Sequence, residues 1–111
     1  MTILVIDSSP IWCRLVRDLF GARHTIIERD DGAEAVRAYQ LFSPALVLMD
    51  IRTRGLGGLE AAQRIKAQWP QARIYIVTQT DDRENREHAA LIGVSGYILK
   101  DDLAHLQQVV G

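Results

Sequence analysis

The sequence predicts an α/β fold in which strands and helices alternate as (βα)5 and build a doubly wound, five-stranded parallel sheet. Short, apolar and largely β-branched runs recur at intervals of about 20 residues, and the segments between them have helical periodicity. Continuously apolar runs are typical of strands covered on both faces. Parallel neighbours need right-handed crossovers, which place helices on both sides of the sheet.

Five apolar runs are the expected strands. They cover Thr2–Ile6, Thr25–Ile27, Ala45–Met49, Ile74–Val77 and Tyr97–Leu99. The first, third and fourth runs are richest in apolar residues, so we expect them at the centre of the sheet. The second run is short and is flanked by His24 and Glu28, which favours an edge. The strand order that fits these features is 2-1-3-4-5.

Apolar stripes at helical spacing predict the helices between the strands. The stripes are Ile11, Leu15, Val16, Leu19 and Phe20, then Val36, Tyr39 and Phe42, then Leu59, Ala62, Ile65 and Trp69. The run from Asp81 to His88 is polar nearly all round, which is typical of a solvated helix face. The last helix is expected to end near Val110.

Capping residues and helix breakers support these helices. The start signals are Ser9-Pro10, Asp31-Gly32 and the pair Asp101 and Asp102, and the stop signals are Ser43-Pro44, Trp69-Pro70 and Gly93. The signals near residues 9–10, 31–32, 43–44 and 69–70 fall at the edges of the three apolar stripes, so the two kinds of pattern agree there.

Composition limits the classes of function. The 111 residues predict one domain spanning 1–111, and 48% hydrophobic with 24% charged residues is ordinary globular composition. A net charge of −1 gives no electrostatic reason to expect nucleic acid or a membrane as a partner. The single cysteine, Cys13, excludes CxxC sites and an intrachain disulfide. Without a bilayer-length apolar run or a signal-type start, we expect a cytoplasmic protein.

Polar residues end four of the expected strands. Asp7, Asp50, Thr78 and Lys100 follow the first, third, fourth and fifth apolar runs. Ligands of such sheets bind at the carboxyl ends of the strands where the strand order reverses, so these side chains should share one crevice. A pair of carboxylates attracts Mg²⁺, and a carboxylate can attack phosphorus while a lysine neutralises the transferring oxygens.

The chain resembles the receiver domains of response regulators in two-component signalling. Four stretches carry the resemblance, namely ILVIDSSP, LVLMDIRTRGLGGLEAAQRI, IYIVTQTDD and GVSGYILKDD. The family has the flavodoxin-like strand order 2-1-3-4-5. The last stretch is similar to receivers attached to helix-turn-helix transcription regulators, although the chain contains no such module.

The resemblance implies a role for each matching residue. Asp50 would be the phosphoacceptor, Thr78 the switch hydroxyl and Lys100 the lysine that contacts the phosphoryl group. Asp7, Asp50 and the backbone carbonyl of Arg52 would hold Mg²⁺. Tyr97 matches the aromatic residue that turns inward on phosphorylation. Any catalysis would be limited to autocatalytic phosphorylation and dephosphorylation of the aspartate.

Three departures from the family pattern affect this interpretation. Ser8 replaces the second acidic residue of the pair, which removes a negative charge and predicts weak Mg²⁺ binding. Gln79 stands where the family has a small residue and narrows access to Asp50. Thr53 and Arg54 replace the usual Met-Pro, which predicts a less rigid loop. These departures predict slow phosphorylation or none.

Two functions therefore remain open. In one, a histidine kinase or a small phosphodonor phosphorylates Asp50, and a face formed by the last strand and its flanking helices then binds an output domain, a partner protein or a second copy. In the other, the chain is a pseudo-receiver that binds proteins without phosphate. A third interpretation, a flavodoxin-like cofactor binder or a small phosphatase, is disfavoured because the first loop is not glycine-rich, and Leu19, where a loop starting at Cys13 needs arginine, excludes a phosphotyrosine-phosphatase loop.

Overall fold

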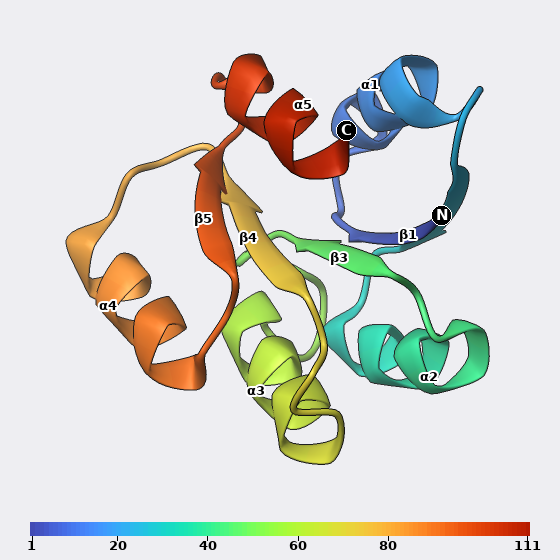
Figure 1. Cartoon of the computed structure of the whole chain (residues 1–111). Helices are drawn as coiled ribbons and strands as arrows, with labels where there is room; N and C mark the ends of the chain where they lie inside the picture. Colours follow the sequence, from blue (N-terminus) through green and yellow to red (C-terminus); the bar gives the residue numbers. More distant parts are fainter.

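A computed structural model describes residues 1–111 as five strands and five helices in strict alternation (Figure 1). The strands are β1 Thr2–Ile6, β2 Thr25–Arg29, β3 Leu46–Met49, β4 Ile74–Thr78 and β5 Gly96–Leu99. The helices are α1 Pro10–Phe20, α2 Gly32–Phe42, α3 Gly58–Gln68, α4 Arg83–Ile92 and α5 Leu103–Val110. All neighbouring strands are parallel and follow the order β2-β1-β3-β4-β5, which confirms the predicted topology.

Helices cover both faces of the sheet, as the continuous apolar strands require. On one face α1 and α5 pack on alternate strand residues such as Ile3, Val5 and Leu48. On the other face α2, α3 and α4 pack on the intervening residues, such as Leu4 and Ile6 (Figure 1). This two-sided burial leaves β1, β3 and β4 central, with their carboxyl ends at one edge of the molecule.

Four strand boundaries differ from the prediction. β2 extends past Ile27 to Arg29, because Glu28 and Arg29 continue the parallel register against β1. Apolar pattern does not reveal this extension, since edge-strand residues need not be apolar. β3 begins at Leu46 rather than Ala45. β4 and β5 are each one residue longer than predicted, at Thr78 and Gly96.

The buried stripe of α1 also differs from the prediction. Ile11 was expected to face the core but is 84% exposed. The buried residues are Trp12, Cys13, Val16 and Phe20. Val16 and Phe20 are buried, and Leu15 and Leu19 pack against the core, so only Ile11 departs from the predicted stripe. Trp12, one position further along, faces the core in its place and contacts the site described below.

The predicted caps are present at the helix ends. The hydroxyl of Ser9 accepts from the backbone N–H of Trp12 at 3.3 Å, and Asp31 accepts from Ala33 at 2.7 Å. Asp102 caps α5 in the same way, and Asp82, which was not predicted as a cap, does so for α4. Gly93 adopts the left-handed conformation expected at the end of α4, with φ of 89°. No helix combines the length and apolar character needed to cross a membrane.

Candidate functional site

Polar residues at the ends of four strands meet at one edge of the sheet. Asp7 follows β1, Asp50 follows β3, Thr78 ends β4 and Lys100 follows β5. Asp7, Asp50 and Thr78 are the only polar or charged residues buried in the chain, at 4%, 8% and 6% exposure. Buried polar groups carry a desolvation cost unless they are paired, so their gathering at one place indicates a site rather than part of the core.

Lys100 joins the two carboxylates. Its Nζ lies 2.8 Å from Oδ2 of Asp7 and 3.5 Å from Oδ2 of Asp50. The same ammonium lies 5.2 Å from the centre of the Trp12 ring, a cation–π distance. Lys100, directly after β5, therefore pairs with both acidic groups, while Trp12 on α1 covers the ammonium from one side.

The contacts of Asp7 leave one of its oxygens incompletely paired. Oδ1 accepts a hydrogen bond from the backbone N–H of Ser9 at 2.9 Å. Oδ2 is buried and accepts no directed hydrogen bond, although Lys100 lies at ion-pair distance. Because the same ammonium also pairs with Asp50, the two carboxylates keep an excess of negative charge that a further cation could balance.

Asp50 lies on the wall of a small cavity of about 40 Å³. The cavity is lined by Asp50, Arg52, Thr78, Gln79, Thr80 and Lys100. The backbone N–H of Arg52 approaches Oδ1 of Asp50 at 3.5 Å. The cavity thus places a carboxylate, a hydroxyl and an ammonium around one space, as the strand ends predicted.

The surroundings of Asp50 disfavour its charged form. Burial raises the pKa of the Asp50 carboxyl above its usual value, and the negative charge of Asp7 raises this pKa further. Lys100 and the N–H of Arg52 oppose these effects and lower the pKa of Asp50. A group or ion that adds positive charge here would relieve the remaining repulsion between the carboxylates.

The donor atoms fit a magnesium ion. Asp7 and Asp50 supply carboxylates and Arg52 supplies a backbone carbonyl, the oxygen ligands that Mg²⁺ prefers alongside several waters. The burial of both carboxylates, which share the single positive charge of Lys100, supports this fit. Ser8 contributes no charge, and its hydroxyl donates to the carbonyl oxygen of Arg52 at 3.3 Å. This hydrogen bond engages an expected ligand atom, so an arriving ion would have to compete with it.

Tyr97 lies outside the cavity that contains Asp50 and Thr78. Its hydroxyl donates to the backbone carbonyl of Thr80 at 3.4 Å, and the guanidinium of Arg86 lies 4.4 Å from its ring centre. Tyr97 instead lines a shallow groove between α4 and β5. Its hydrogen bond to Thr80 links β5 to the loop that follows Thr78.

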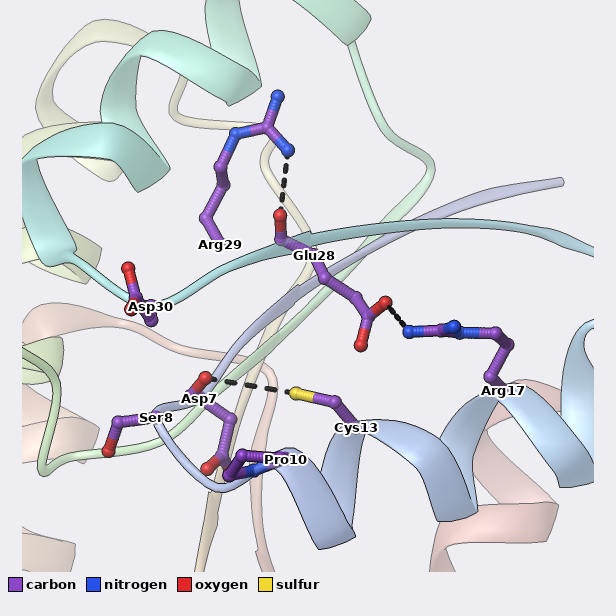
Figure 2. Close-up of a pocket in the computed structure, with 8 residues that line it drawn as sticks. All are labelled: Asp7, Ser8, Pro10, Cys13, Arg17, Glu28, Arg29 and Asp30. Carbon is purple, nitrogen blue, oxygen red and sulfur yellow. Dashed lines mark hydrogen bonds and ion pairs between the residues drawn. The ribbon is translucent and has the colours of Figure 1, made fainter.

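A larger, open depression of about 390 Å³ lies beside Asp7 (Figure 2). It is lined by Asp7, Ser8, Pro10, Cys13, Arg17, Glu28, Arg29 and Asp30. Arg17 and Glu28 form an ion pair across it, and the Cys13 thiol donates to the carbonyl of Asp7 at 3.7 Å. Burial, together with Glu28, raises the pKa of Cys13 to about 12, so the thiol is neutral and acts as a packing group.

Sequence reasoning missed several neighbours of the site. The stacking of Trp12 on Lys100 and the pairing of Arg17 with Glu28 come from different elements and have no spacing that signals them. The polar end of β2 was the only available clue. Its Glu28 and Arg29 carry charges past the expected end of the strand.

Comparison with known proteins gives the family. The family model described as "Response regulator receiver domain" matches residues 3–111. Chemotaxis protein CheY of Halobacterium salinarum is 33% identical over 99 residues, which cover 88% of this chain and 82% of that protein. The nitrate/nitrite response regulator NarL of Escherichia coli K12 is 28% identical over 103 residues. That match covers 90% of this chain and 48% of NarL, so the chain spans about half of this longer relative.

Solved structures agree in fold. A two-component response regulator of the LuxR family from Aurantimonas sp. is 34% identical, with a TM-score of 0.90 over 98% of this chain and 81% of that chain. The BeF3-activated N-terminal receiver domain of RstA from Klebsiella pneumoniae is 25% identical, also with a TM-score of 0.90, over 98% of this chain and 95% of that chain. With the strand order and the clustered strand-end residues, these matches show that the chain belongs to the response regulator receiver domain family.

Proposed function

We propose that Asp50 accepts a phosphoryl group and that the chain thereby works as a phosphorylation-dependent signalling receiver. The observation that supports this most directly is the cavity in which the Asp50 carboxylate faces Thr78 and Lys100. An oxygen of Asp50 would attack phosphorus as the bond from phosphorus to the donor's leaving group breaks. The products are an aspartyl phosphate and the departing imidazole or carboxylate.

The neighbouring side chains have roles that follow from their positions. Lys100 would move from the carboxylates to an oxygen of the incoming phosphoryl group and neutralise it. The Thr78 hydroxyl would donate to another of these oxygens. Gln79, which is exposed at the cavity wall, narrows the entrance and slows the reaction. Receivers of this kind modify only themselves, so no separate substrate is turned over.

The Mg²⁺ of this reaction would be held by Asp7, Asp50 and the carbonyl of Arg52. When bound, the ion supplies positive charge to the transferring oxygens. Ser8 makes this binding weak for two reasons. It brings no carboxylate, and its hydroxyl already donates to the Arg52 carbonyl. The loss of a ligand charge should weaken binding by at least about 10-fold relative to an acidic residue.

The output surface would include β5, α4 and α5. Withdrawal of Thr78 toward the phosphoryl group pulls on the loop that carries Thr80, to which Tyr97 is bonded. Leu91 on α4 is 88% exposed and Leu103 on α5 is 37% exposed, so this face has apolar side chains to offer a partner. A histidine kinase would be the donor in the cytoplasm. An output domain, a partner protein or a second copy would bind the face, with no part for nucleic acid in this chain.

A phosphodonor assay tests this proposal. The protein is incubated with Mg²⁺ and acetyl phosphate, and its intact mass is measured beside that of Asp50→Asn. We expect a gain of one phosphoryl group in the wild type and none in the variant. An unchanged wild-type mass at millimolar Mg²⁺ contradicts the proposal.

The same variant separates a receiver from a pseudo-receiver. If phosphorylation drives the output, Asp50→Asn should lose phosphodonor-dependent binding to a partner or to a second copy. Unaltered partner binding by Asp50→Asn, together with an unphosphorylated wild type, is the result expected of a phosphate-independent binding module.

A further inference from the structure

The loop after Asp50 is attached to the loop after β2 by backbone hydrogen bonds. The N–H of Arg54 donates to the carbonyl of Asp30 at 2.9 Å, and the N–H of Gly32 donates to the carbonyl of Arg54 at 3.2 Å. Asp31 and Arg54 thus form a parallel bridge outside the named strands. The Arg54 guanidinium also lies 3.7 Å from the Asp30 carboxylate. We call residues 30–32 and 54–56 the loop clamp.

Glycines allow the two loops of the clamp to approach so closely. A Cβ on Gly32 would lie 2.0 Å from the carbonyl oxygen of Leu56, a distance that no side chain tolerates. Gly55 has a φ of 62°, and a Cβ there would lie 2.9 Å from the Asp31 carboxylate. The close approach of the two loops therefore depends on glycine at positions 32 and 55.

The clamp ends two residues from a ligand atom of the acidic site. The carbonyl of Arg52 accepts from Ser8 on one side, and the chain continues through Thr53 to the bridge at Arg54 on the other. The Thr53 hydroxyl donates to the carbonyl of Leu56 at 2.5 Å, which closes the turn. Arg54 occupies the position where proline was expected from the resemblance. Proline has no N–H, so it could not form this bridge.

We propose that Arg54 is a positioning residue that uses its backbone N–H to hold the Arg52 carbonyl in place for the cation of the acidic site. The hydrogen bonds of the clamp tie this loop to the loop after β2 and thereby fix the path of the chain between Arg52 and Leu56. The role of the Arg52 carbonyl as a ligand for Mg²⁺ rests on the proposed function. The positioning itself is a property of the protein before any metal or phosphoryl group arrives.

The exposed ion pair contributes little to the clamp. The side chains of Arg54 and Asp30 are 74% and 58% exposed, and solvent screens such pairs. Arg54→Ala keeps the N–H and should therefore behave like the wild type. Arg54→Pro removes the N–H as well and should not. The comparison of these two variants separates the backbone contribution from that of the guanidinium.

Two glycine variants give an independent test, because Arg54→Pro removes both the N–H hydrogen bond to Asp30 and the ion pair with its carboxylate. Gly32→Ala forces the loops apart at Leu56. Gly57→Ala is the matched control in the same loop, since its Cβ would meet only the Ile51 carbonyl at 3.9 Å. Melting temperatures of all variants establish that each is folded at the temperature of measurement.

The experiment has two readouts. In the metal-free protein, the backbone ¹³C′ resonance of Arg52 should shift in Arg54→Pro and Gly32→Ala and stay in place in Arg54→Ala and Gly57→Ala. In a Trp69→Phe background, Trp12 fluorescence should report Mg²⁺ binding about 10-fold weaker in the first pair of variants. At saturating Mg²⁺, the rate at which acetyl phosphate phosphorylates Arg54→Pro and Gly32→Ala should remain within about two-fold of the wild-type rate, since only the ligand carbonyl has moved.

Arg54→Pro and Gly32→Ala proteins that are folded and keep the wild-type Arg52 resonance overturn the proposal, as does an equal shift in both glycine variants. Failure of the wild type to become phosphorylated has a different meaning. It contradicts the proposed function and leaves the metal-free readout to decide about the clamp.

Discussion

At the scale of single residues, Lys100 has the largest electrostatic role, because it is the only cation paired with the two buried carboxylates. Lys100→Met should lower the free energy of unfolding at pH 7 by about 3 kcal/mol, the usual cost of removing one partner of a buried pair. Urea denaturation measures this loss. Arg64→Met, which removes an exposed partner of Glu60, is the control and should cost less than about 1 kcal/mol.

The loss in Lys100→Met should shrink when either carboxylate is neutral. The double variant Lys100→Met, Asp50→Asn should recover part of the stability, because only Asp7 then remains charged. A loss of equal size in both backgrounds would show that Lys100 stabilises the fold through packing on Trp12 rather than through its charge.

Asp50 should make the fold less stable as pH rises. Its pKa is raised in the folded protein, so the folded state holds the proton more tightly than the unfolded state does. The ionised carboxylate therefore destabilises the fold above its raised pKa, and this penalty disappears below the ordinary carboxyl pKa of about 4. Asp50→Asn should have a higher melting temperature than the wild type at pH 7.

The advantage of Asp50→Asn should decrease steadily as pH falls and vanish near the ordinary carboxyl pKa. Asp18→Asn is the matched control, since Asp18 lies on α1 with a side chain that is 69% exposed. An advantage that is independent of pH would contradict the electrostatic explanation.

Ser8 should determine how strongly the site binds Mg²⁺. Ser8→Asp adds a carboxylate beside Asp7 and the Arg52 carbonyl, so a fluorescence titration in the Trp69→Phe background should show binding at least about 10-fold tighter. Ser8→Ala removes only the hydrogen bond to Arg52. A small gain or no change in Ser8→Ala, with a large gain in Ser8→Asp, assigns the weakness to the missing charge. Equal Mg²⁺ affinity in Ser8→Asp and the wild type would contradict the idea that the missing charge makes binding weak.

At the scale of elements, α4 has the weakest attachment to the core. Ala89 is its only buried residue, whereas Ile3, Leu4, Val5 and Ile6 of β1 are all at most 1% exposed. Segments with little buried apolar surface open locally at low cost. Amide hydrogen exchange should therefore be faster in α4 than in α1 or α3, and a uniformly protected α4 would contradict this.

The cap of α4 makes the same idea testable by mutation. Asp82 accepts from the N–H of Asn85 at 3.2 Å. Asp82→Ala should speed exchange in α4 by about five-fold, equivalent to the roughly 1 kcal/mol of a lost cap, and leave α1 unchanged. Acceleration throughout the protein would instead indicate that α4 unfolds only with the whole molecule.

The elements themselves could be predicted because strands and helices leave different local patterns. The Ser9-Pro10 start of α1 and the Gly93 end of α4 are short-range signals, and both were read correctly. The exposure of Ile11 on α1 was not predicted, because the choice between Ile11 and Trp12 depends on how the helix packs on the sheet. The end of β2 was also missed, since Glu28 and Arg29 are held by register against β1 rather than by burial.

At the scale of the whole molecule, the site is a consequence of topology. Once the order β2-β1-β3-β4-β5 is known, the residues after four strands must share an edge, so Asp7, Asp50 and Lys100 could be grouped from the sequence. Contacts between loops, and between elements distant in sequence, could not be predicted from the sequence. Ser8 with Arg52 and Arg54 with Asp30 depend on the paths of loops, which carry no periodicity.

The proposed function depends most on an oxygen of Asp50 forming the bond to phosphorus. Borohydride reduction of an aspartyl phosphate converts the acceptor into homoserine, which mass spectrometry of peptides locates in the chain. After incubation with acetyl phosphate and Mg²⁺, we predict homoserine at position 50 alone. Homoserine at Asp7 or another aspartate, or none at any position, would contradict the account.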